Sequence, residues 1–241
     1  MLAKAEPSPS QPAAAVDHRT RVGEERRERT RRKLLESAVE VYARKGPDGA
    51  TIEDLIGAAG VARGTFYNYF PTTEALLEAV GGQMSDEALA VVDPTAMAFS
   101  DAAERVAAGT RHYCEMARRY PLWGEIVTRI GARLAARGKL LETYVNRDVQ
   151  RGLDQKRFDI PSRVVGRNVV LGSIFYSIET AMTAPVDEHP VENTVVCMLR
   201  GLGIGNKEAH SIAFMELPEM GPIPGPLFAK ISTVKRPRRR R

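Results

Sequence analysis

Residues 51–70, TIEDLIGAAGVARGTFYNYF, restrict the possible folds of this chain more than any other stretch. The apolar residues of its first half recur at the spacing of one helical face: Ile52, Leu55, Ile56 and Ala59. Thr51 and Asp54 have the spacing of a capping box at the start of this helix, and Gly60 permits the positive φ that ends it. The stretch therefore predicts a short helix that runs into a tight turn.

A second short helix is predicted to begin at Ala62. It buries Phe66 and Phe70, and it leaves six residues nearer the outside: Arg63, Gly64, Thr65, Tyr67, Asn68 and Tyr69. Two short helices joined by a tight turn form the motif that lays its second helix in the major groove of DNA. The pattern therefore predicts a helix-turn-helix DNA reader.

The run from 31 to 80 resembles the N-terminal domain of the TetR family of bacterial transcriptional repressors. The pieces that carry this resemblance are TIEDL at 51–55, AGV at 59–61, GTFYNYF at 64–70 and EAL at 74–76. The resemblance implies an all-α protein in which a three-helix DNA-binding domain is joined to a larger helical domain for ligand binding and dimerisation. It also implies a homodimer that binds a palindromic operator and is released by a small-molecule effector.

The side chains of the second helix suggest how DNA is read. A guanidinium binds guanine O6 and N7 bidentately in the major groove, so Arg63 is the candidate for base readout. Gly64 lets the backbone approach closely, and Thr65 can donate to a phosphate or touch a thymine methyl group. Asn68 either reads adenine or bonds a phosphate.

Four further DNA contacts follow from the resemblance. Tyr67 and Tyr69 stand where the family contacts the DNA backbone, although they can also be plain surface aromatics. Thr51 matches a position that commonly binds phosphate. Thr73 departs from the pattern, because the family often has Lys there. An arginine-rich segment can compensate for the missing charge: Arg26, Arg27, Arg29, Arg31 and Arg32.

Positive charge is concentrated at the two ends of the chain. The net charge is +5, but residues 235–241 (KRPRRRR) carry six positive charges and no acid, so the other 234 residues sum to −1. A second basic concentration occupies residues 19–33. Basic arms neutralise phosphates without reading sequence. The alternative to a sequence-specific repressor is therefore an architectural protein that binds DNA non-specifically through its termini, and both arms can also be solvated ends without a role.

The pattern of helical stretches and breaks divides the chain into four parts. We expect a disordered arm at 1–23 and the DNA-binding domain at 24–75, with a fourth helix at 73–92 as the connection. A helical effector-binding and dimerisation domain follows at 93–218, and a Pro/Gly linker with a basic, disordered tail at 219–241. The first helix is predicted to start at Glu24 or Arg29, and Pro94 to start a new segment.

Two predicted helices, 162–183 and 191–202, correspond to those with which the family dimerises. The first is apolar on more than one face, so it has to be buried on both. A monomer that hides this helix in its centre is the alternative. Six large residues are candidates to line an effector pocket between helices, although each can also be ordinary core: Tyr113, Met116, Trp123, Tyr144, Phe175 and Tyr176. Few acidic residues are expected there, which favours a neutral or acidic apolar effector.

Other classes of protein fit the sequence less well. No apolar run approaches the roughly 18 residues of a membrane span. Cys114 and Cys197 lack metal-ligand spacing and are expected to be reduced core thiols, which fits a cytoplasmic protein. No catalytic motif is present, and neither a cofactor nor a metal site is indicated. We therefore expect double-stranded operator DNA, a second copy of the chain and a small molecule as partners, and no enzyme activity.

Overall fold

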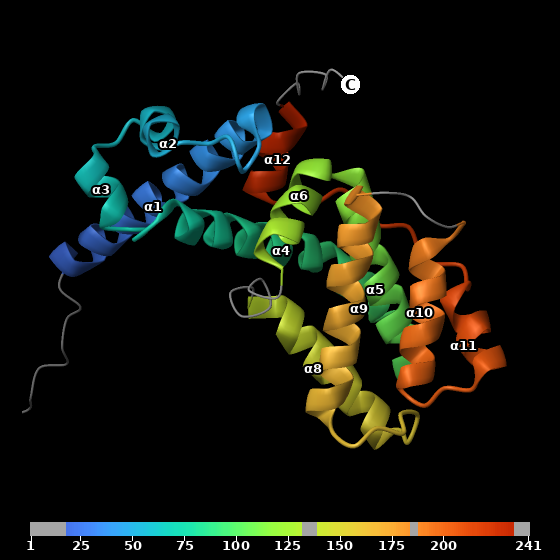
Figure 1. Ribbon diagram of the computed structural model, residues 1–241. Helices are drawn as coiled ribbons and strands as arrows, with labels where there is room; N and C mark the ends of the chain where they lie inside the picture. Colours follow the sequence, from blue (N-terminus) through green and yellow to red (C-terminus); the bar gives the residue numbers. More distant parts are fainter. Residues whose placement is uncertain (1–17, 132–138, 184–187, 234–241) are drawn as a thin grey trace, which may run out of the picture.

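The computed structural model describes residues 18–131, 139–183 and 188–233, and these form helices joined by turns and loops, with no strand among them. The predicted all-α class is confirmed. Most of the predicted N-terminal arm and the basic residues 235–241 lie outside the described residues. Figure 1 shows a smaller group of helices at the N-terminal end and a larger bundle built from the rest of the chain.

The smaller group consists of α1 (His18–Lys45), α2 (Ile52–Ala59) and α3 (Arg63–Tyr67). Leu34, Val39, Leu55 and Phe66 are buried between these helices, which is why the short α2 and α3 hold their places. α4 (Thr73–Ala96) leaves this group and runs into the larger bundle (Figure 1). Along the chain, α4 thus connects the two parts.

α1 begins at His18, so the predicted start at Glu24 or Arg29 is wrong and so is the disorder predicted for residues 18–23. The segment is rich in Arg and Glu, which favour helix, and its Arg21 and Glu25 are paired at the i,i+4 spacing with 3.7 Å between Nε and Oε1. Gly23 is tolerated inside the helix. The basic segment is therefore a helical extension of the DNA-binding unit.

Pro94 does not start a new segment, because α4 continues through it to Ala96. The last turn stays hydrogen-bonded despite the missing N–H of the proline. The Thr95 hydroxyl donates to the Val92 carbonyl at 2.7 Å, and the Met97 N–H donates to the Asp93 carbonyl at 2.8 Å. The connection therefore extends beyond the predicted limit at residue 92.

The larger bundle is organised around α5 (Ala102–Arg119). The helices that pack around it are α4, α6 (Pro121–Ile130), α8 (Lys139–Asp154), α9 (Arg163–Thr183), α10 (Pro190–Gly201) and α11 (Asn206–Ala213). Along α5 most side chains are buried, as expected for a helix with neighbours on several sides. α9 and α10 lie side by side in the bundle, with α11 beyond α10 (Figure 1). Cys197 of α10 is exposed, so the core position expected for it is wrong, whereas Cys114 of α5 is buried.

The predicted linker and disordered tail are wrong for residues 226–233, which form α12 (Pro226–Thr233). Helices this short are marginal in isolation. Leu227 and Phe228 are 1% and 2% exposed, and α12 packs on α1 and α4. Tertiary burial, to which no local pattern points, therefore makes this segment helical.

Candidate DNA interface and effector cavity

The turn between α2 and α3 is built as its residues predict. The Thr51 hydroxyl accepts the Asp54 N–H at 3.3 Å, and the Asp54 carboxylate accepts the Thr51 N–H at 3.1 Å, which confirms the capping box. Gly60 ends α2 with φ of 58°. Phe66 is completely buried, so its neighbours on the other face of α3 must point outward.

The outer surface of α3 carries the predicted DNA-reading residues. Arg63, Gly64, Tyr67 and Asn68 are exposed, and Thr65 and Tyr69 are half-buried. Arg63 Nη2 lies 3.1 Å from Glu53 Oε1 on α2. The structure thus brings the six residues of the second reader helix onto one short exposed element, beside an acidic residue that the sequence reasoning left out.

A second ion pair supports the start of α2. Lys45 Nζ lies 2.6 Å from Asp54 Oδ1. This hydrogen bond and those from the Thr51 N–H and hydroxyl lower the pKa of Asp54 from 3.8 to about 2. Thr51 is exposed at the same helix end, which leaves its backbone close to solvent.

Thr73 is not the residue that caps α4. Thr72 is the cap of α4, because its hydroxyl accepts the Ala75 N–H at 3.0 Å. The Thr73 hydroxyl donates to the Glu74 carboxylate at 3.3 Å. Thr73 lies at the helix N-terminus as expected, and its contact with a phosphate stays a prediction.

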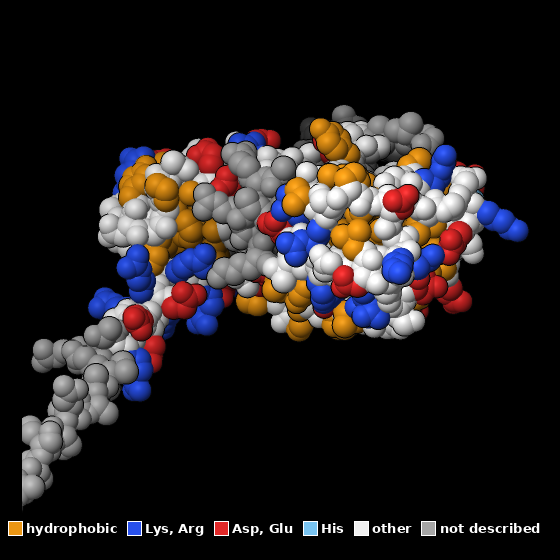
Figure 2. Space-filling view, turned by 90° about the horizontal axis from the view of Figure 1, so that it is seen from below, with side chains coloured by type: hydrophobic (Ala, Val, Ile, Leu, Met, Phe, Trp, Pro, Cys, Tyr) orange, Lys and Arg blue, Asp and Glu red, His pale blue; other side chains and the backbone are white. Residues whose placement is uncertain are grey.

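The helical extension of α1 forms an open depression with α3. Its volume is about 570 Å³, and it is lined by Gly23, Arg26, Arg27, Thr30, Thr65, Asn68 and Tyr69. The guanidinium carbon of Arg27 lies 5.9 Å from the centre of the Tyr69 ring. Among the residues that the structure describes, no carboxylate lines this depression. Figure 2 shows that charged side chains dominate the projecting part of the molecule from which α1 begins.

Sequence reasoning recognised these arginines but not their placement. From the sequence, these arginines are expected only as part of an arm that supplies the positive charge missing at Thr73. The helix instead holds Arg26 and Arg27 next to Asn68 and Tyr69 of the reader. Residues 24–29 (EERRER), an unbroken run of helix-favouring Glu and Arg, are the signal in the sequence that favours a helix here.

The six predicted pocket residues do not line one cavity, although the ring centre of Tyr113 lies 4.9 Å from that of Trp123. Met116 and Trp123 are 1% and 0% exposed, and they line neither of the two cavities described below. Tyr176 is 73% exposed, so it does not lie in the interior. Tyr113 and Tyr144 line a small inner cavity, whereas Phe175 and Tyr176 line a separate outer pocket.

The inner cavity lies between α4, α5, α8 and α9 and has a volume of about 40 Å³. Its wall is mainly apolar: Leu89, Val92, Ala96, Val106, Leu141, Val145, Val170 and Ile174. The Tyr113 hydroxyl is within 2.6 Å of the Ser85 hydroxyl. Burial raises the pKa of Tyr113, so this hydroxyl stays neutral.

Charged residues at the inner cavity correct the expectation that acidic residues are scarce there. Asp93, Arg105 and Asp148 all line it. Arg147 joins both carboxylates: its Nη2 is 2.6 Å from Asp93 Oδ1 and its Nε is 2.9 Å from Asp148 Oδ1. Arg105 Nη1 lies 3.6 Å from Asp148 Oδ1, and the two side chains are 7% and 10% exposed.

This set, Asp93, Arg105, Arg147 and Asp148, is called the charged cluster below. Hydrogen bonds to Asp93 and Asp148 raise the pKa of Arg147. Buried charges are found where they are paired and hydrogen-bonded, as Arg105 and Asp148 are in this cluster. Its residues come from α4, α5 and α8 and are up to 55 positions apart in the sequence. No spacing in the sequence therefore pointed to it.

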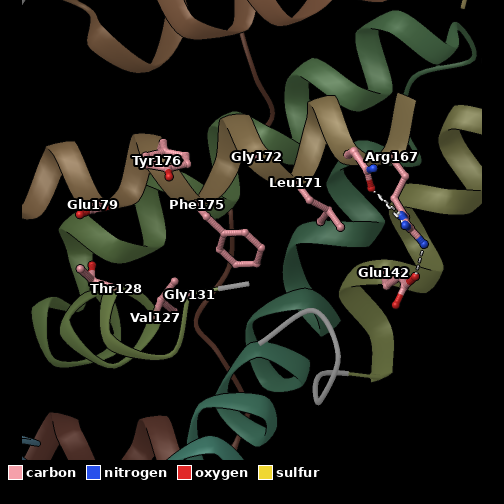
Figure 3. A pocket seen from close by; sticks show the side chains of 11 residues that line it. Val127, Thr128, Gly131, Glu142, Arg167, Leu171, Gly172, Phe175, Tyr176 and Glu179 are labelled. Carbon is pink, nitrogen blue, oxygen red and sulfur yellow. Dashed lines mark hydrogen bonds and ion pairs between the residues drawn. The ribbon is translucent and has the colours of Figure 1, made fainter. Parts of the chain in front are cut away.

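The outer pocket is larger, at about 520 Å³, and lies between the end of α6, α8 and the outward face of α9. Figure 3 shows Phe175 and Leu171 pointing from α9 toward this space, with Val127 and Thr128 opposite. Arg167 Nη1 lies 2.6 Å from Glu142 Oε1 at one end. Its volume exceeds that of the inner cavity, but it is open at the surface of α9.

The DNA-binding helices and the larger bundle with its cavities both match known protein families. Residues 34–80 match the family described as bacterial regulatory proteins, tetR family, and residues 101–214 match the tetracyclin repressor-like C-terminal domain. RolR bound to resorcinol is 30% identical, with a TM-score of 0.74 over 82% of this chain and 100% of that one. The chain belongs to the TetR family.

Two curated relatives of this TetR-family protein match over the DNA-binding region. The regulator YvdT of Bacillus subtilis is 48% identical over 48 residues, which are 20% of this chain and 25% of that protein. The repressor LfrR of Mycolicibacterium smegmatis is 37% identical over 83 residues, 33% of this chain and 43% of that protein. The chain thus spans less than half the length of either relative.

The family consists of transcriptional regulators, which are not enzymes. A solved FadR from Bacillus subtilis in complex with stearoyl-CoA, 19% identical with a TM-score of 0.54 over 72% of this chain and 98% of that one, shares the fold. Among the described residues, no helix is long and apolar enough to cross a membrane.

Proposed function

We propose that this TetR-family regulator is a ligand-responsive repressor that binds a palindromic operator as a homodimer. The observation that carries the proposal is the depression between α3 and the α1 extension, where Arg26 and Arg27 stand beside Thr65 and Asn68. Arg63 is exposed at the start of the same α3 helix. Arg63 reads guanine, and the other two arginines neutralise phosphates. The two α3 helices of a dimer enter successive major grooves about one helical turn, roughly 34 Å, apart.

Dimerisation is assigned to α9 and α10. Val164, Val165 and Tyr176 of α9 are large apolar residues with exposed fractions of 51%, 42% and 73%. Such exposure on one helix is unfavourable unless another surface covers it. Homodimers are typical of the family, so a second copy is the proposed cover, and the alternative that α9 is hidden inside a monomer loses support because these residues are exposed.

The proposed effector is a small phenol that enters the inner cavity. RolR, a similar protein of known structure, forms a complex with resorcinol, which is a dihydroxybenzene. In this chain an apolar wall surrounds one charged edge, which suits a ring with hydroxyl groups. Each carboxylate oxygen has two lone pairs, so Asp93 and Asp148 can accept from a phenol while they remain bound to Arg147.

The size of the inner cavity supplies a mechanism for release. A dry cavity of about 150 Å³ accommodates benzene. The cavity of about 40 Å³ must therefore widen to admit a phenol, which moves its walls apart. Leu89, Val92 and Asp93 of that wall belong to α4, the same helix that begins next to the reader. The ligand favours a conformation in which the two α3 helices no longer match the operator spacing.

The test begins with selection of duplexes from random DNA by the full-length chain. Dissociation constants for a selected duplex and a scrambled one are then measured across a salt series. A preference of at least about a hundredfold is expected, and Arg63→Ala should remove most of it. Arg118→Ala is the matched control, because Arg118 is an exposed arginine of α5 that pairs with Glu115 of the same helix, far from α3 along the chain.

Equal affinity for both duplexes would contradict the proposal that the protein is a sequence-specific repressor. If the salt dependence were steep and vanished on removal of residues 235–241, the architectural alternative would hold instead. Resorcinol is the first effector probe. A titration that leaves the affinity for the selected duplex unchanged, and shows no binding to the protein alone, would overturn the assignment of a phenolic effector.

A further inference from the structure

α12 contacts three elements that belong to different parts of the molecule. It packs along α1 of the DNA-binding unit and against α4 (Figure 1). The Phe228 ring centre is 4.8 Å from that of Tyr120, which directly precedes α6, and 6.4 Å from that of Trp123 within α6. The helix therefore lies where the DNA-binding unit, the connecting helix and the larger bundle meet.

The N-terminus of α12 is held by a buried carboxylate. Glu87 on α4 accepts the Leu227 N–H at 3.1 Å and the Phe228 N–H at 3.2 Å, and it is 7% exposed. A carboxylate at this position satisfies N–H groups that have no partner within the helix. A Cβ on Gly225 would collide with the Glu87 carboxylate, so the close approach requires glycine there.

The other end of α12 is joined to α1. Lys230 Nζ lies 2.8 Å from Glu40 Oε1, and both side chains are partly exposed. A surface pair of this kind contributes little to stability. It does, however, align α12 with the last turns of α1, just before the loop that leads to α2.

We propose that Glu87 and Phe228 are positioning residues for operator recognition, because through α12 they set the angle between the DNA-binding unit and the larger bundle. In a dimer built on α9 and α10, that angle sets the separation of the two α3 helices. The inference rests on the proposed operator-binding dimer. It adds a C-terminal element that neither matched family region, 34–80 or 101–214, includes.

The first experiment measures the angle without DNA. Spin labels are placed at Ala58→Cys on α2 and Lys207→Cys on α11, both exposed, in a full-length Cys197→Ser background diluted with unlabelled protein. The wild-type background should give one narrow distance distribution. Phe228→Ala and Glu87→Gln should each broaden it or shift it. Ile212→Ala, which removes buried packing in α11 away from α12, should leave it unchanged.

The second experiment uses selected operator duplexes whose half-site spacing is changed by one or two base pairs. The wild type should bind the altered duplexes at least about tenfold more weakly, since each base pair displaces a half-site by about 3.4 Å. In Phe228→Ala and Glu87→Gln this penalty should fall to less than about threefold, because a loosened unit adapts to either spacing.

Glu87→Gln keeps the size of the side chain and an acceptor oxygen, so it tests the same element if Phe228→Ala does not fold. Unchanged distance distributions together with an unchanged spacing penalty would show that α12 only stabilises the fold and would overturn the inference. If selection yields no operator, the proposed function fails, and the label distances still decide whether α12 sets the angle.

Discussion

Arg63 Nη2 and Glu53 Oε1 are 3.1 Å apart, so the candidate base-reading guanidinium is bound to a carboxylate of the preceding helix. The side chains are 58% and 66% exposed, and such pairs add at most about 1 kcal/mol to stability. The carboxylate therefore matters for the direction of Arg63 and for the charge that faces DNA, rather than for the fold.

Glu53→Gln should raise operator affinity by roughly threefold to tenfold, because Arg63 loses a competing partner and the phosphates lose a nearby negative charge. The unfolding midpoint should change little. Binding titrations and thermal unfolding of the same preparation measure both. A fall in affinity would show instead that Glu53 orients Arg63 for readout.

The arginines of the α1 extension should contribute affinity without sequence preference. Arg26→Ala with Arg27→Ala should lower the slope of log K against log salt by about 1.8, since each phosphate that is no longer neutralised accounts for about 0.9. The ratio of affinities for selected and scrambled DNA should stay nearly constant. If the ratio of affinities fell toward one, these arginines would take part in base readout. If the salt slope were unchanged, they would not contact the DNA phosphates.

Asp54 should make the DNA-binding unit sensitive to acid. Its pKa is about 2 in the folded chain, below the ordinary value of 3.8, because Lys45 and Thr51 stabilise the ionised form. The stability that this adds is fully present above about pH 4 and is lost as the pH falls toward 2. The unfolding midpoints of wild type and Asp54→Asn should differ at pH 6 and approach each other at pH 2. If the two unfolding midpoints differed by the same amount at both pH values, the ionised Asp54 carboxylate would not be the cause of the difference in stability.

Gly109→Ala should stabilise the protein by about 1 kcal/mol, because glycine is unfavourable inside a helix. The added Cβ would meet nothing closer than the Ala96 Cβ at 3.8 Å. Gly81→Ala is the matched contrast, since its Cβ would collide with Ile130 Cδ1 and lie 3.0 Å from Ile126 Cγ2. That change should cost about 1–3 kcal/mol. The midpoint of thermal unfolding should therefore rise in Gly109→Ala and fall in Gly81→Ala.

The same glycine tests the location of the effector. Gly109 lines the inner cavity, so an added methyl group should weaken resorcinol binding by about tenfold or more. Gly172→Ala adds a methyl group to the outer pocket, where nothing lies within 4 Å, and should leave the affinity nearly unchanged. Calorimetric titration of both variants with resorcinol decides between the two sites. If Gly172→Ala weakened binding and Gly109→Ala did not, the ligand would bind in the outer pocket.

The apolar face of α9 should control the oligomeric state. Val165→Glu together with Tyr176→Glu would place two charges in the proposed interface and should weaken the dimer by at least about a hundredfold. Val22→Glu is the control, because it changes another exposed apolar residue, 46% exposed, on α1. Sedimentation velocity across a concentration series measures the association. An unchanged dimer would place the interface elsewhere.

Local chemistry explains what could be read from the residues alone. The Thr51–Asp54 box and the positive φ of Gly60 depend on atoms a few positions apart, so residues 51–70 specify the reader and its exposed face. The helical character of the larger bundle follows in the same way from periodicity. These features hold wherever such a stretch occurs.

Long-range packing decided the rest. Glu87 holds α12 through the N–H of Leu227, 140 positions away, and Asp148 reaches the inner cavity beside Asp93 only because α8 crosses α4. The residues predicted to line one pocket, such as Trp123 and Tyr176, lie in the core and on the surface respectively. A cavity, a buried charge and a docked short helix each depend on several elements together, and their energies arise only when distant segments exclude water between them.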